Sequence, residues 1–331
     1  MSRYSKKRIG VVWAISCALV LALGLAGCAQ GQGSPSSAQS QTGTTPSASV
    51  EAPSPIAEIT DVTTVAYLGP EGTYTEEAAK LFFGDNDEMM PQTTVADALA
   101  LVAEGKAAYA VVPQENTLGG PVTDYLDAFL ATDSVSVVGE VVLPIRQTLM
   151  GLAGTDLSKV TRVLSHKQGL AQSAAWLDEN LPNAERVEAA STAAAAQEVA
   201  EGGDNTVVAI AAPGAANLYK LEVLKENVSQ TEANKTRFYV VSKRANELPG
   251  YECAVFTARI AADELPGVLD AACAEGAKLV CVHDRPEKSA LGTYRYVIEL
   301  ERDNGFSDEE TSRLKGIDKL EYLGRYSRIE G

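Results

Sequence analysis

Histidine and cysteine are scarce in this sequence, which limits the metal chemistry that it could carry. Only two of the 331 residues are histidine and five are cysteine. Cys17 and Cys28 lie near the N-terminus, and the other three, Cys253, Cys273 and Cys281, do not stand at the short spacings that are typical of a zinc site. We therefore expect no metal site and interpret these three as buried small hydrophobic residues. A Cys273–Cys281 disulfide is the alternative if the chain is exported.

Positive charge is also in short supply. The chain has 28 Lys and Arg against 44 Asp and Glu, which gives a formal net charge of -16. Such an acidic body repels nucleic acid and anionic membrane surfaces, so we expect neither as a binding partner. An anionic substrate would need a local cationic pocket. The hydrophobic content of 45% is ordinary for a globular protein, and the length predicts about two domains.

A long apolar run occurs at the N-terminus, where residues 9–27 follow the basic segment 3–8. Small residues precede Cys28 and a polar tract follows it, and this arrangement resembles the lipobox of bacterial lipoproteins. The resemblance implies a signal peptide over residues 1–27, lipidation of Cys28, and export to the outer face of the cell membrane, where the lipid anchors the protein. An uncleaved membrane anchor is the alternative.

The following segment, residues 28–60, consists largely of Gln, Gly, Ser, Thr, Pro and Ala. Such a composition cannot bury enough apolar surface to fold. We expect a flexible tether that holds the folded part away from the membrane.

Residues 61–245 alternate short apolar strands with helices. This order predicts an α/β domain with parallel sheets and helices on both faces. The expected strands are 64–69, 108–113, 136–151, 161–164, 187–189, 206–211 and a last one from 239. The expected helices are 74–83, 95–104, 122–130, 170–179, 192–199 and 212–219.

The pattern changes after residues 248–250. Residues 250–328 have the order βαββαβ, which is typical of a ferredoxin-like α+β domain. The expected strands are 253–260, 278–283, 293–301 and 319–326, and the expected helices are 265–275 and 308–315.

Polar loops follow several strands of the first domain, at the edge where open α/β sheets bind ligands. The turn 69–73 ends in Thr73, a predicted helix N-cap with Glu76 three residues later. In the loop 114–120, Glu115 and Asn116 are either turn formers or acid/base and amide groups aimed into a cleft.

Residues 234–238 open the last strand of that domain. Because side chains alternate along a strand, Thr236 and Phe238 should face one way and Arg237 the other. Taken alone, the segment indicates a strand start with Phe238 in the core and one solvated arginine.

Together, these segments resemble the prephenate dehydratase family, and residues 250–328 resemble the ACT regulatory domain that follows in such enzymes. The family motifs occur here as Gly69-Pro70-Glu71-Gly72-Thr73, Val112-Pro113-Gln114-Glu115-Asn116-Thr117, Ser165-His166-Lys167-Gln168, Ser191-Thr192-Ala193 and Asn234-Lys235-Thr236-Arg237-Phe238. The resemblance implies a two-lobed, periplasmic-binding-protein-like catalytic domain that converts prephenate to phenylpyruvate without metal or organic cofactor.

The resemblance also assigns roles to residues. Thr236 would assist departure of the hydroxyl, with Glu115 or a water sharing the proton and Asn116 completing the catalytic set. Arg237 or Lys167 would offset the charge of the substrate. The full expected substrate-binding set is Thr73, Thr117, Ser165, Gln168, Ser191, Thr192 and Arg237.

The C-terminal domain departs from the family pattern. Its Gly267-Val268-Leu269 stands where relatives have Gly-Ala-Leu, and in the first domain Gln147 stands where a His is usual. The resemblance therefore implies regulation by L-phenylalanine less firmly than it implies catalysis. It also implies a homodimer or homotetramer. The expected effector-binding residues are Leu265, Gly267, Val268, Leu269, Asp284, Arg285 and Pro286.

Two other functions fit the same sequence. An arogenate dehydratase would use the same motifs. A non-catalytic, lipid-anchored binding or sensor protein for an aromatic acid would also have two α/β lobes, although it would need no donor for a leaving group.

Overall fold

The computed structural model describes residues 63–84, 87–229 and 233–331. These belong to one compact unit, residues 49–331. The expected signal peptide, Cys28 and the whole of the expected tether lie outside the described residues, and so the structure does not test them. Within the described part of the chain, no helix is long and apolar enough to cross a membrane.

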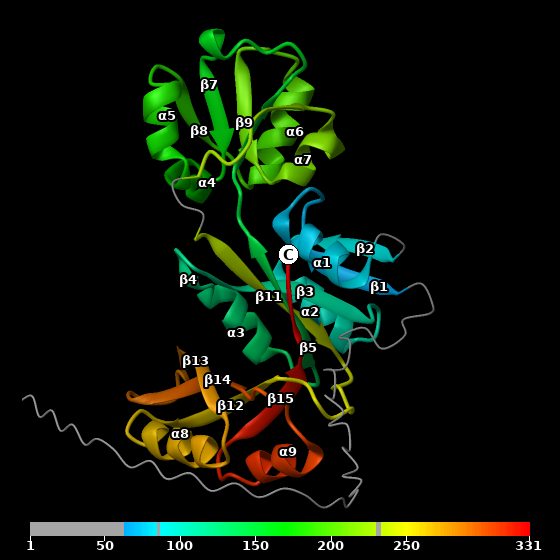
Figure 1. The fold of residues 1–331 in the computed structure, drawn as a ribbon, viewed down its shortest axis with the longest axis vertical. Helices are drawn as coiled ribbons and strands as arrows, with labels where there is room; N and C mark the ends of the chain where they lie inside the picture. The colour runs from blue at the N-terminus through cyan, green and yellow to red at the C-terminus, as the bar shows by residue number, and fades with distance from the viewer. Residues whose placement is uncertain (1–62, 85–86, 230–232) are drawn as a thin grey trace, which may run out of the picture. The chain divides into compact units, whose positions relative to one another are not determined.

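The first lobe is built on a sheet in which strands from distant parts of the chain meet. The strand order is β16-β5-β11-β3-β1-β2, and β4 pairs with β3. Figure 1 shows α1, α2 and α3 beside this sheet. Its strands are β1 (Thr64–Leu68), β2 (Glu88–Gln92), β3 (Tyr109–Asn116), β4 (Gly120–Pro121), β5 (Ser136–Pro144), β11 (Lys235–Ser242) and β16 (Arg328–Glu330), and its helices are α1 (Tyr74–Phe83), α2 (Val95–Ala103) and α3 (Thr123–Ala131).

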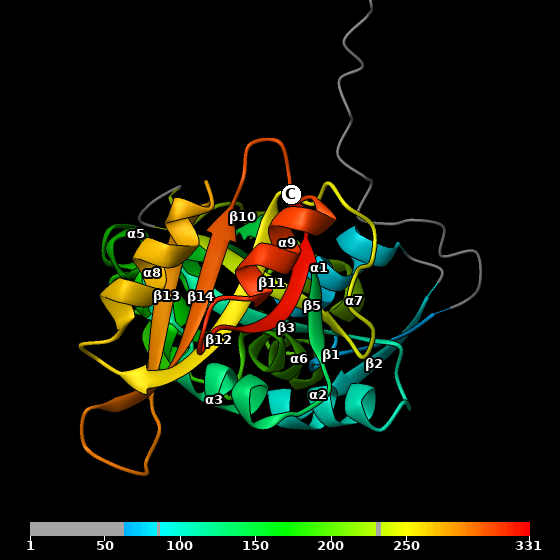
Figure 2. The same cartoon turned by 90° about the horizontal axis from the view of Figure 1, so that it is seen from below.

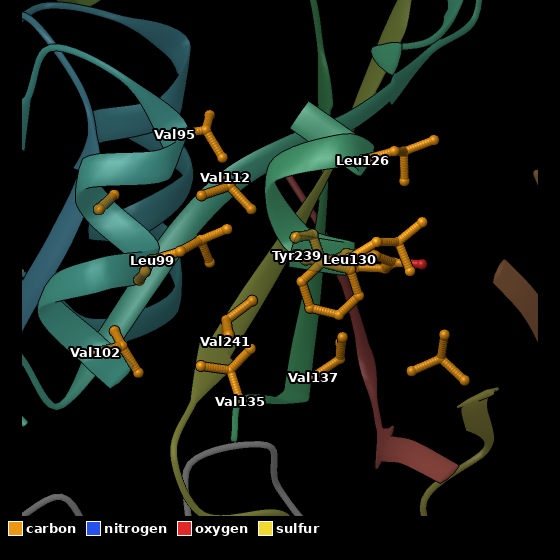
Figure 3. Packing of buried hydrophobic residues seen from close by; sticks show 14 of the residues in the cluster. Val95, Leu99, Val102, Val112, Leu126, Leu130, Val135, Val137, Tyr239 and Val241 are labelled. Atoms are coloured by element: carbon orange, nitrogen blue, oxygen red, sulfur yellow. The ribbon is translucent and has the colours of Figure 1, made fainter. Parts of the chain in front are cut away.

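The core of this lobe forms where the apolar faces of its helices meet the central strands. Leu99 and Val102 of α2 and Leu126 of α3 pack around Tyr239 and Val241 of β11 (Figure 3). Tyr239 and Val241 stand two positions apart, so both side chains project from the same face of the strand.

The second lobe has its own five-stranded sheet with the order β10-β6-β9-β7-β8. Strands β7, β8 and β9 are parallel, whereas β6 and β10 run antiparallel to their neighbours. The elements are β6 (Thr148–Gly151), β7 (Arg162–Ser165), β8 (Glu185–Glu188), β9 (Val207–Ala211), β10 (Glu222–Lys225), the 3-10 helix η1 (Leu157–Lys159), α4 (Lys167–Gln172), α5 (Ala174–Asn180), α6 (Thr192–Gly202) and α7 (Pro213–Tyr219).

Two segments connect the lobes and hydrogen-bond to each other. The Ile145 N–H donates to the carbonyl of Asn234 over 2.7 Å, and the Val228 N–H donates to that of Gln147 over 2.7 Å. The returning strand β11 inserts between β3 and β5 and is antiparallel to both. The prediction of uniformly parallel sheets is therefore wrong, because the chain re-enters the first sheet from the opposite direction.

The C-terminal domain is an antiparallel sheet with the order β13-β14-β12-β15. Figures 1 and 2 show α8 and α9 on the same face of this sheet. The predicted βαββαβ order and ferredoxin-like arrangement are confirmed. The elements are β12 (Cys253–Ala261), α8 (Leu265–Ala274), β13 (Lys278–Pro286), β14 (Thr293–Glu301), α9 (Asp308–Lys315) and β15 (Glu321–Tyr326).

The other face of this sheet packs on the first lobe. Val255 of β12 and Val297 of β14 belong to the same buried cluster as Leu99 and Tyr239. After β15 the chain continues into β16, which pairs in parallel with β5. The C-terminal domain is thus joined to the first lobe both by a shared core and by a shared sheet.

Several element boundaries differ from the sequence prediction. The edge strands β2 and β10 were missed, since β2 contains Pro91 and both lack strong apolar alternation. The predicted helix 170–179 is two helices that meet at Ser173. Strands β3 and β13 run three residues further than predicted, to Asn116 and Pro286.

The cysteines divide differently from the prediction. Cys253 is buried, Cys281 is half-buried, Cys273 is exposed, and all three are free thiols. The interpretation as buried hydrophobic residues is confirmed for Cys253 and wrong for Cys273, which lies on the outer face of α8.

Candidate active site

A pocket of about 260 Å³ is lined by residues of both lobes. The first lobe contributes Thr73 before α1, Asn116 at the end of β3 and Thr236 at the start of β11. The second contributes Gln168 of α4 and Thr192 of α6. The fold thus gathers in one cavity residues that are far apart in the sequence.

Asn116 and Thr236 face each other across two paired strands. Asn116 Nδ2 donates a hydrogen bond to Thr236 Oγ1 over 3.0 Å. The same amide nitrogen is 2.8 Å from Asn234 Oδ1, and Asn116 Oδ1 accepts from the N–H groups of Leu118 and Gly119. Both ends of the Asn116 amide are therefore engaged, and its orientation is fixed.

A β-bulge decides which residues of β3 reach the pocket. Arg237 pairs with Glu115, but the next residue, Phe238, pairs with Pro113, so Gln114 is the extra residue. Pro113 and Asn116 consequently both line the pocket although they stand three positions apart. Gln114 and Glu115 are turned to the opposite face of the sheet.

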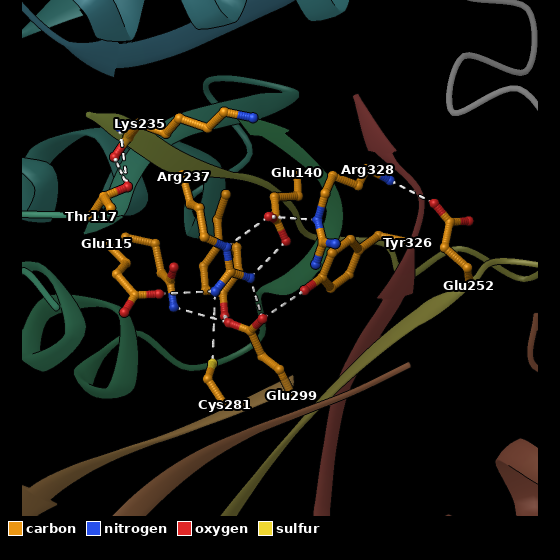
Figure 4. A network of polar contacts seen from close by, with 12 residues as sticks. Glu115, Thr117, Glu140, Lys235, Arg237, Glu252, Cys281, Glu299, Tyr326 and Arg328 are labelled. Atoms are coloured by element: carbon orange, nitrogen blue, oxygen red, sulfur yellow. Dashed lines mark hydrogen bonds and ion pairs between the residues drawn. The ribbon is translucent and has the colours of Figure 1, made fainter. Parts of the chain in front are cut away.

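On that opposite face, Arg237 lies at the centre of a carboxylate network (Figure 4). Its guanidinium contacts Glu140 at 2.8 and 2.9 Å and Glu115 at 3.1 Å, and it also pairs with Glu299 of β14. Arg328 of β16 adds a second contact to Glu140 at 3.0 Å. Arg237 thereby connects the strand that carries Thr236 to the C-terminal domain.

The network is held together by charge in a buried environment. Glu140 and Glu299 are 0% and 1% exposed. Burial alone would raise the pKa of Glu140, but the guanidinium groups of Arg237 and Arg328 outweigh it and hold the pKa below its ordinary value. Burial and the neighbouring Glu299 raise the pKa of Tyr239, which therefore remains a neutral donor to that carboxylate.

Comparison with known proteins decides the family. The family model of prephenate dehydratase matches residues 65–246. The chain is 35% identical to the bifunctional chorismate mutase/prephenate dehydratase of Aquifex aeolicus, over 81% of this chain and 72% of that protein. It is 33% identical to the prephenate dehydratase of Amycolatopsis methanolica, over 81% of this chain and 89% of that protein. The chain belongs to the prephenate dehydratase family.

Solved structures agree with the family assignment. The prephenate dehydratase of Arthrobacter aurescens, solved in complex with L-Phe, aligns with a TM-score of 0.71 and 31% identity over 80% of this chain and 90% of that chain. A protein described as a novel type of quorum quenching acylase aligns with a TM-score of 0.69 and 27% identity, over 80% of this chain and 98% of that chain. The two-lobed fold with a C-terminal domain is thus the fold of the prephenate dehydratase family.

Three residues expected at the family's active site do not line the pocket. Glu115 and Arg237 are on the network face of the sheet and do not line the cavity that Thr236 lines. Lys167 does not line it either. Their expected roles in proton sharing and in charge compensation therefore find no support in this geometry, because an ordinary strand alternation separates Arg237 from Thr236.

Three further residues that were expected to bind the substrate make hydrogen bonds to the protein backbone instead. The hydroxyl of the buried Ser165 donates to the carbonyl of Ile210 over 2.7 Å. Ser191 caps α6 by accepting from the Ala194 N–H over 3.0 Å. Thr117 exchanges two hydrogen bonds with the backbone of Lys235, one donated and one accepted. None of these three is among the residues that line the pocket.

The pocket also contains polar residues that the sequence analysis did not assign to it. Gln147 and Gln172 line it and hydrogen-bond to each other over 2.9 Å. Gln147 Oε1 is buried without a hydrogen-bond partner among the described residues. His166 lines the pocket as the N-cap of α4. The departure at Gln147 and the presence of His166 in the Ser165–Gln168 motif were the signals in the sequence for this part of the site.

The expected effector residues come together at one end of the C-terminal sheet. Strands β12 and β13 are both antiparallel to β14, so they run in the same direction. The start of α8, with Leu265, and the end of β13, with Pro286, therefore lie at the same end of the sheet. Arg285 makes a two-point ion pair with Asp127 of α3, at 2.7 and 2.8 Å, and lowers the pKa of that carboxyl. The remaining members of the set are Gly267, Val268, Leu269 and Asp284.

Proposed function

We propose that this protein converts prephenate to phenylpyruvate, CO₂ and water. The observation that carries the proposal is the hydroxyl of Thr236. Its oxygen accepts from Asn116 and it lines the inter-lobe pocket, so its own proton is free to be donated into that pocket. A binding protein needs no such donor.

The reaction requires one donated proton and no redox partner. As the ring carboxylate leaves as CO₂, its bonding electrons enter the ring while the bond from the ring to the hydroxyl breaks. The departing oxygen takes up a proton and leaves as water, and the ring becomes aromatic. A hydrogen bond from Thr236 to the departing oxygen stabilises the charge that develops there.

Thr236 is a weak acid, so a second group must replace the proton. His166 is suited to this role, because its Nδ1 accepts from the Gln168 N–H over 3.3 Å and the ring proton then sits on Nε2. Gln147 and Gln172, joined to each other, are placed to hold polar groups of the substrate.

Prephenate is a dianion, and the residues that line the pocket include no lysine or arginine. Arg146 and Lys235 line an adjoining cavity of about 610 Å³, which shares Ile145 with the pocket. Arg146 is exposed between Ile145 and Gln147, both of which line the pocket. We therefore assign charge compensation to Arg146 and Lys235 rather than to Arg237 or Lys167.

The decisive test is turnover by the purified protein. Prephenate should yield phenylpyruvate, and a parallel reaction with arogenate, assayed for phenylalanine, distinguishes the two dehydratases. Turnover of arogenate alone would make the protein an arogenate dehydratase. Saturable binding of prephenate without product from either compound would favour the sensor function.

Regulation by L-phenylalanine forms part of the proposal. The start of α8 and the end of β13 would hold the amino acid, and Gly267 has no atom near the position of a side chain there. Phenylalanine should lower turnover in the wild type and lose this effect in Gly267→Glu, whose carboxylate would repel that of the ligand. Equal inhibition of both proteins would place the effector elsewhere.

Anchoring and assembly complete the proposal. We expect the protein to be a lipoprotein on the outer face of the membrane and to form homodimers or homotetramers. Fractionation should find the wild type with membranes and Cys28→Ala in the soluble fraction, and light scattering should give the mass of the assembly. A soluble wild type would contradict the lipid anchor.

A further inference from the structure

Three side chains with metal-binding atoms converge behind the active-site strands. They are Glu115 of β3 and Cys281 and His283 of β13, and their ligand atoms all lie within 4.8 Å of one another. Cys281 Sγ is 3.5 Å from His283 Nε2, and the same nitrogen is 3.9 Å from Glu115 Oε2. Figure 4 shows Glu115 and Cys281 both joined to the Arg237 guanidinium by dashed lines.

The fold explains the convergence. Cys281 and His283 stand two positions apart on β13, so both project from one face of that strand. Glu115 reaches them because it is paired directly with Arg237 on the neighbouring strand and so lies on the same face of the sheet. The three ligands therefore come from two domains, and their spacing in the sequence does not reveal them.

We propose that Glu115, Cys281 and His283 bind one divalent transition-metal ion of the zinc class and thereby clamp the first lobe to the C-terminal domain. Cys, His and Glu are each zinc ligands, and a water molecule would complete the fourth position beside these three protein ligands. Tetrahedral coordination at ordinary zinc–ligand lengths separates the ligand atoms by about 3.4–3.6 Å. Cys281 and His283, at 3.5 Å, already have this spacing, and the carboxylate of Glu115, at 3.9 Å from His283 and within 4.8 Å of Cys281, must move toward both to reach it.

The charge around the three ligands permits a cation despite the nearby Arg237. Its guanidinium is already held by Glu140 and Glu299, and Arg328 contributes the network's second positive charge. With Glu115, three carboxylates face two guanidinium groups, so the network carries an excess of negative charge. Glu115 is the carboxylate with spare acceptor capacity, because its one arginine contact is at 3.1 Å.

The ligand types select the metal class. Calcium and magnesium prefer oxygen ligands only, whereas a thiolate and an imidazole favour zinc and copper. Arg237 Nη1 is 3.7 Å from Cys281 Sγ and would remain beside the thiolate once the metal displaced its proton. The expectation of no metal rested on the scarcity of histidine and on cysteine spacing along the sequence, neither of which shows that Glu115 lies beside Cys281 and His283.

The test is a titration of the purified full-length protein with Co²⁺, followed by competition with Zn²⁺. One Co²⁺ per chain should bind and give the intense near-ultraviolet absorption of a cobalt–thiolate bond, which Zn²⁺ then removes. Cys281→Ser should lose this absorption, and Glu115→Gln should weaken binding while keeping it. Cys273→Ser is the matched control, since Cys273 is exposed and outside the cluster, and it should behave as the wild type.

Several outcomes would overturn the proposal. The site is excluded if the wild type binds no stoichiometric Co²⁺, if the absorption survives Cys281→Ser, or if the absorption depends on Cys273 or Cys28. A second readout keeps the test sound if a variant folds poorly: Zn²⁺ should raise the unfolding midpoint of the wild type and of Cys273→Ser but not of His283→Gln. An equal rise in all three would mean that zinc acts elsewhere.

Discussion

Asn116 Nδ2 donates to Thr236 Oγ1 over 3.0 Å, while Asn116 Oδ1 accepts from the N–H groups of Leu118 and Gly119 at 3.0 Å each. The two backbone donors determine which end of the amide is the oxygen. Thr236 must then be the acceptor in its contact with Asn116, which leaves the threonine proton for the pocket. Asn116 is on this basis a positioning residue, and Thr236 is the group that touches the departing oxygen.

Thr236→Val tests the donor directly, because valine keeps the shape of threonine and removes the hydroxyl. We expect kcat to fall about 100-fold or more, as for other losses of one well-placed donor, with little change in the unfolding midpoint. Thr236→Ser keeps the hydroxyl and should retain most of the activity. Near-normal turnover by Thr236→Val would exclude Thr236 from the chemical step.

Asn116→Asp tests the orientation of that hydroxyl. A carboxylate cannot donate to Thr236 Oγ1 and would accept its proton instead, so kcat should fall about as far as in Thr236→Val. If the residues act as a unit, the double variant Asn116→Asp/Thr236→Val should be scarcely worse than either single variant. Additive losses would show that Asn116 has a separate role.

The opposite facing of Thr236 and Arg237 could be predicted from the sequence, because strand alternation depends only on position. The opposite facing of Glu115 and Pro113 could not. It follows from the bulge at Gln114, which becomes visible only when β3 is paired with β11. A one-residue shift of this kind moves a side chain to the other face of a sheet, so Pro113 joins Asn116 on the pocket face, whereas Glu115 faces away from Asn116 by ordinary alternation.

The motif around Ser165 shows a second limit of the sequence. Its Ser165 hydroxyl is committed to the carbonyl of Ile210 on β9, and a side chain at Gly169 would lie 2.4 Å from that hydroxyl. The partner is remote in the chain, and so the sequence cannot distinguish a structural serine from a binding one. His166 and Gln168 of the same motif, together with Gln172 at the end of α4, are the residues that reach the pocket.

Arg146→Gln tests how the substrate charge is compensated. Removal of this exposed cation beside the pocket should raise KM for prephenate about tenfold, in line with the loss of one charge-assisted contact, and leave kcat nearly unchanged. The effect should shrink as salt is added. Arg186→Gln is the control, since Arg186 pairs with Asp178 away from the pocket. An unchanged KM in Arg146→Gln would assign the substrate charge to other groups.

Arg237→Gln tests the stability of the network. The change leaves Glu140 and Glu299 buried without their main cation, and the loss of one partner from a buried ion pair costs about 3–5 kcal/mol of unfolding free energy. Arg237→Lys keeps the charge but not the forked geometry of the guanidinium, so its unfolding free energy should lie between those of the wild type and Arg237→Gln. Lys278→Ala breaks an exposed pair with Asp303 and should leave the urea midpoint unchanged. If Lys278→Ala lowered the unfolding free energy as much as Arg237→Gln, burial of the network would not explain the cost of losing Arg237.

The unfolding free energy at low pH should also depend on this network, through the ionisation of Glu140. Its pKa is lowered in the folded protein because Arg237 and Arg328 outweigh the effect of burial. A carboxylate with a lowered folded pKa contributes stability that is fully present above the unfolded pKa of about 4.3 and is lost as the pH falls through the folded pKa. Loss of Arg237 leaves burial to raise the pKa of Glu140 relative to the wild type, so the difference in unfolding free energy between the wild type and Arg237→Gln should be largest near pH 7 and shrink as the pH falls through the folded pKa of Glu140, first in the variant and then in the wild type. Urea titrations of both proteins between pH 7 and 3 measure this difference. A gap that stays constant to pH 3 would show that Glu140 remains ionised throughout and that the charge of Arg237 is balanced by other groups.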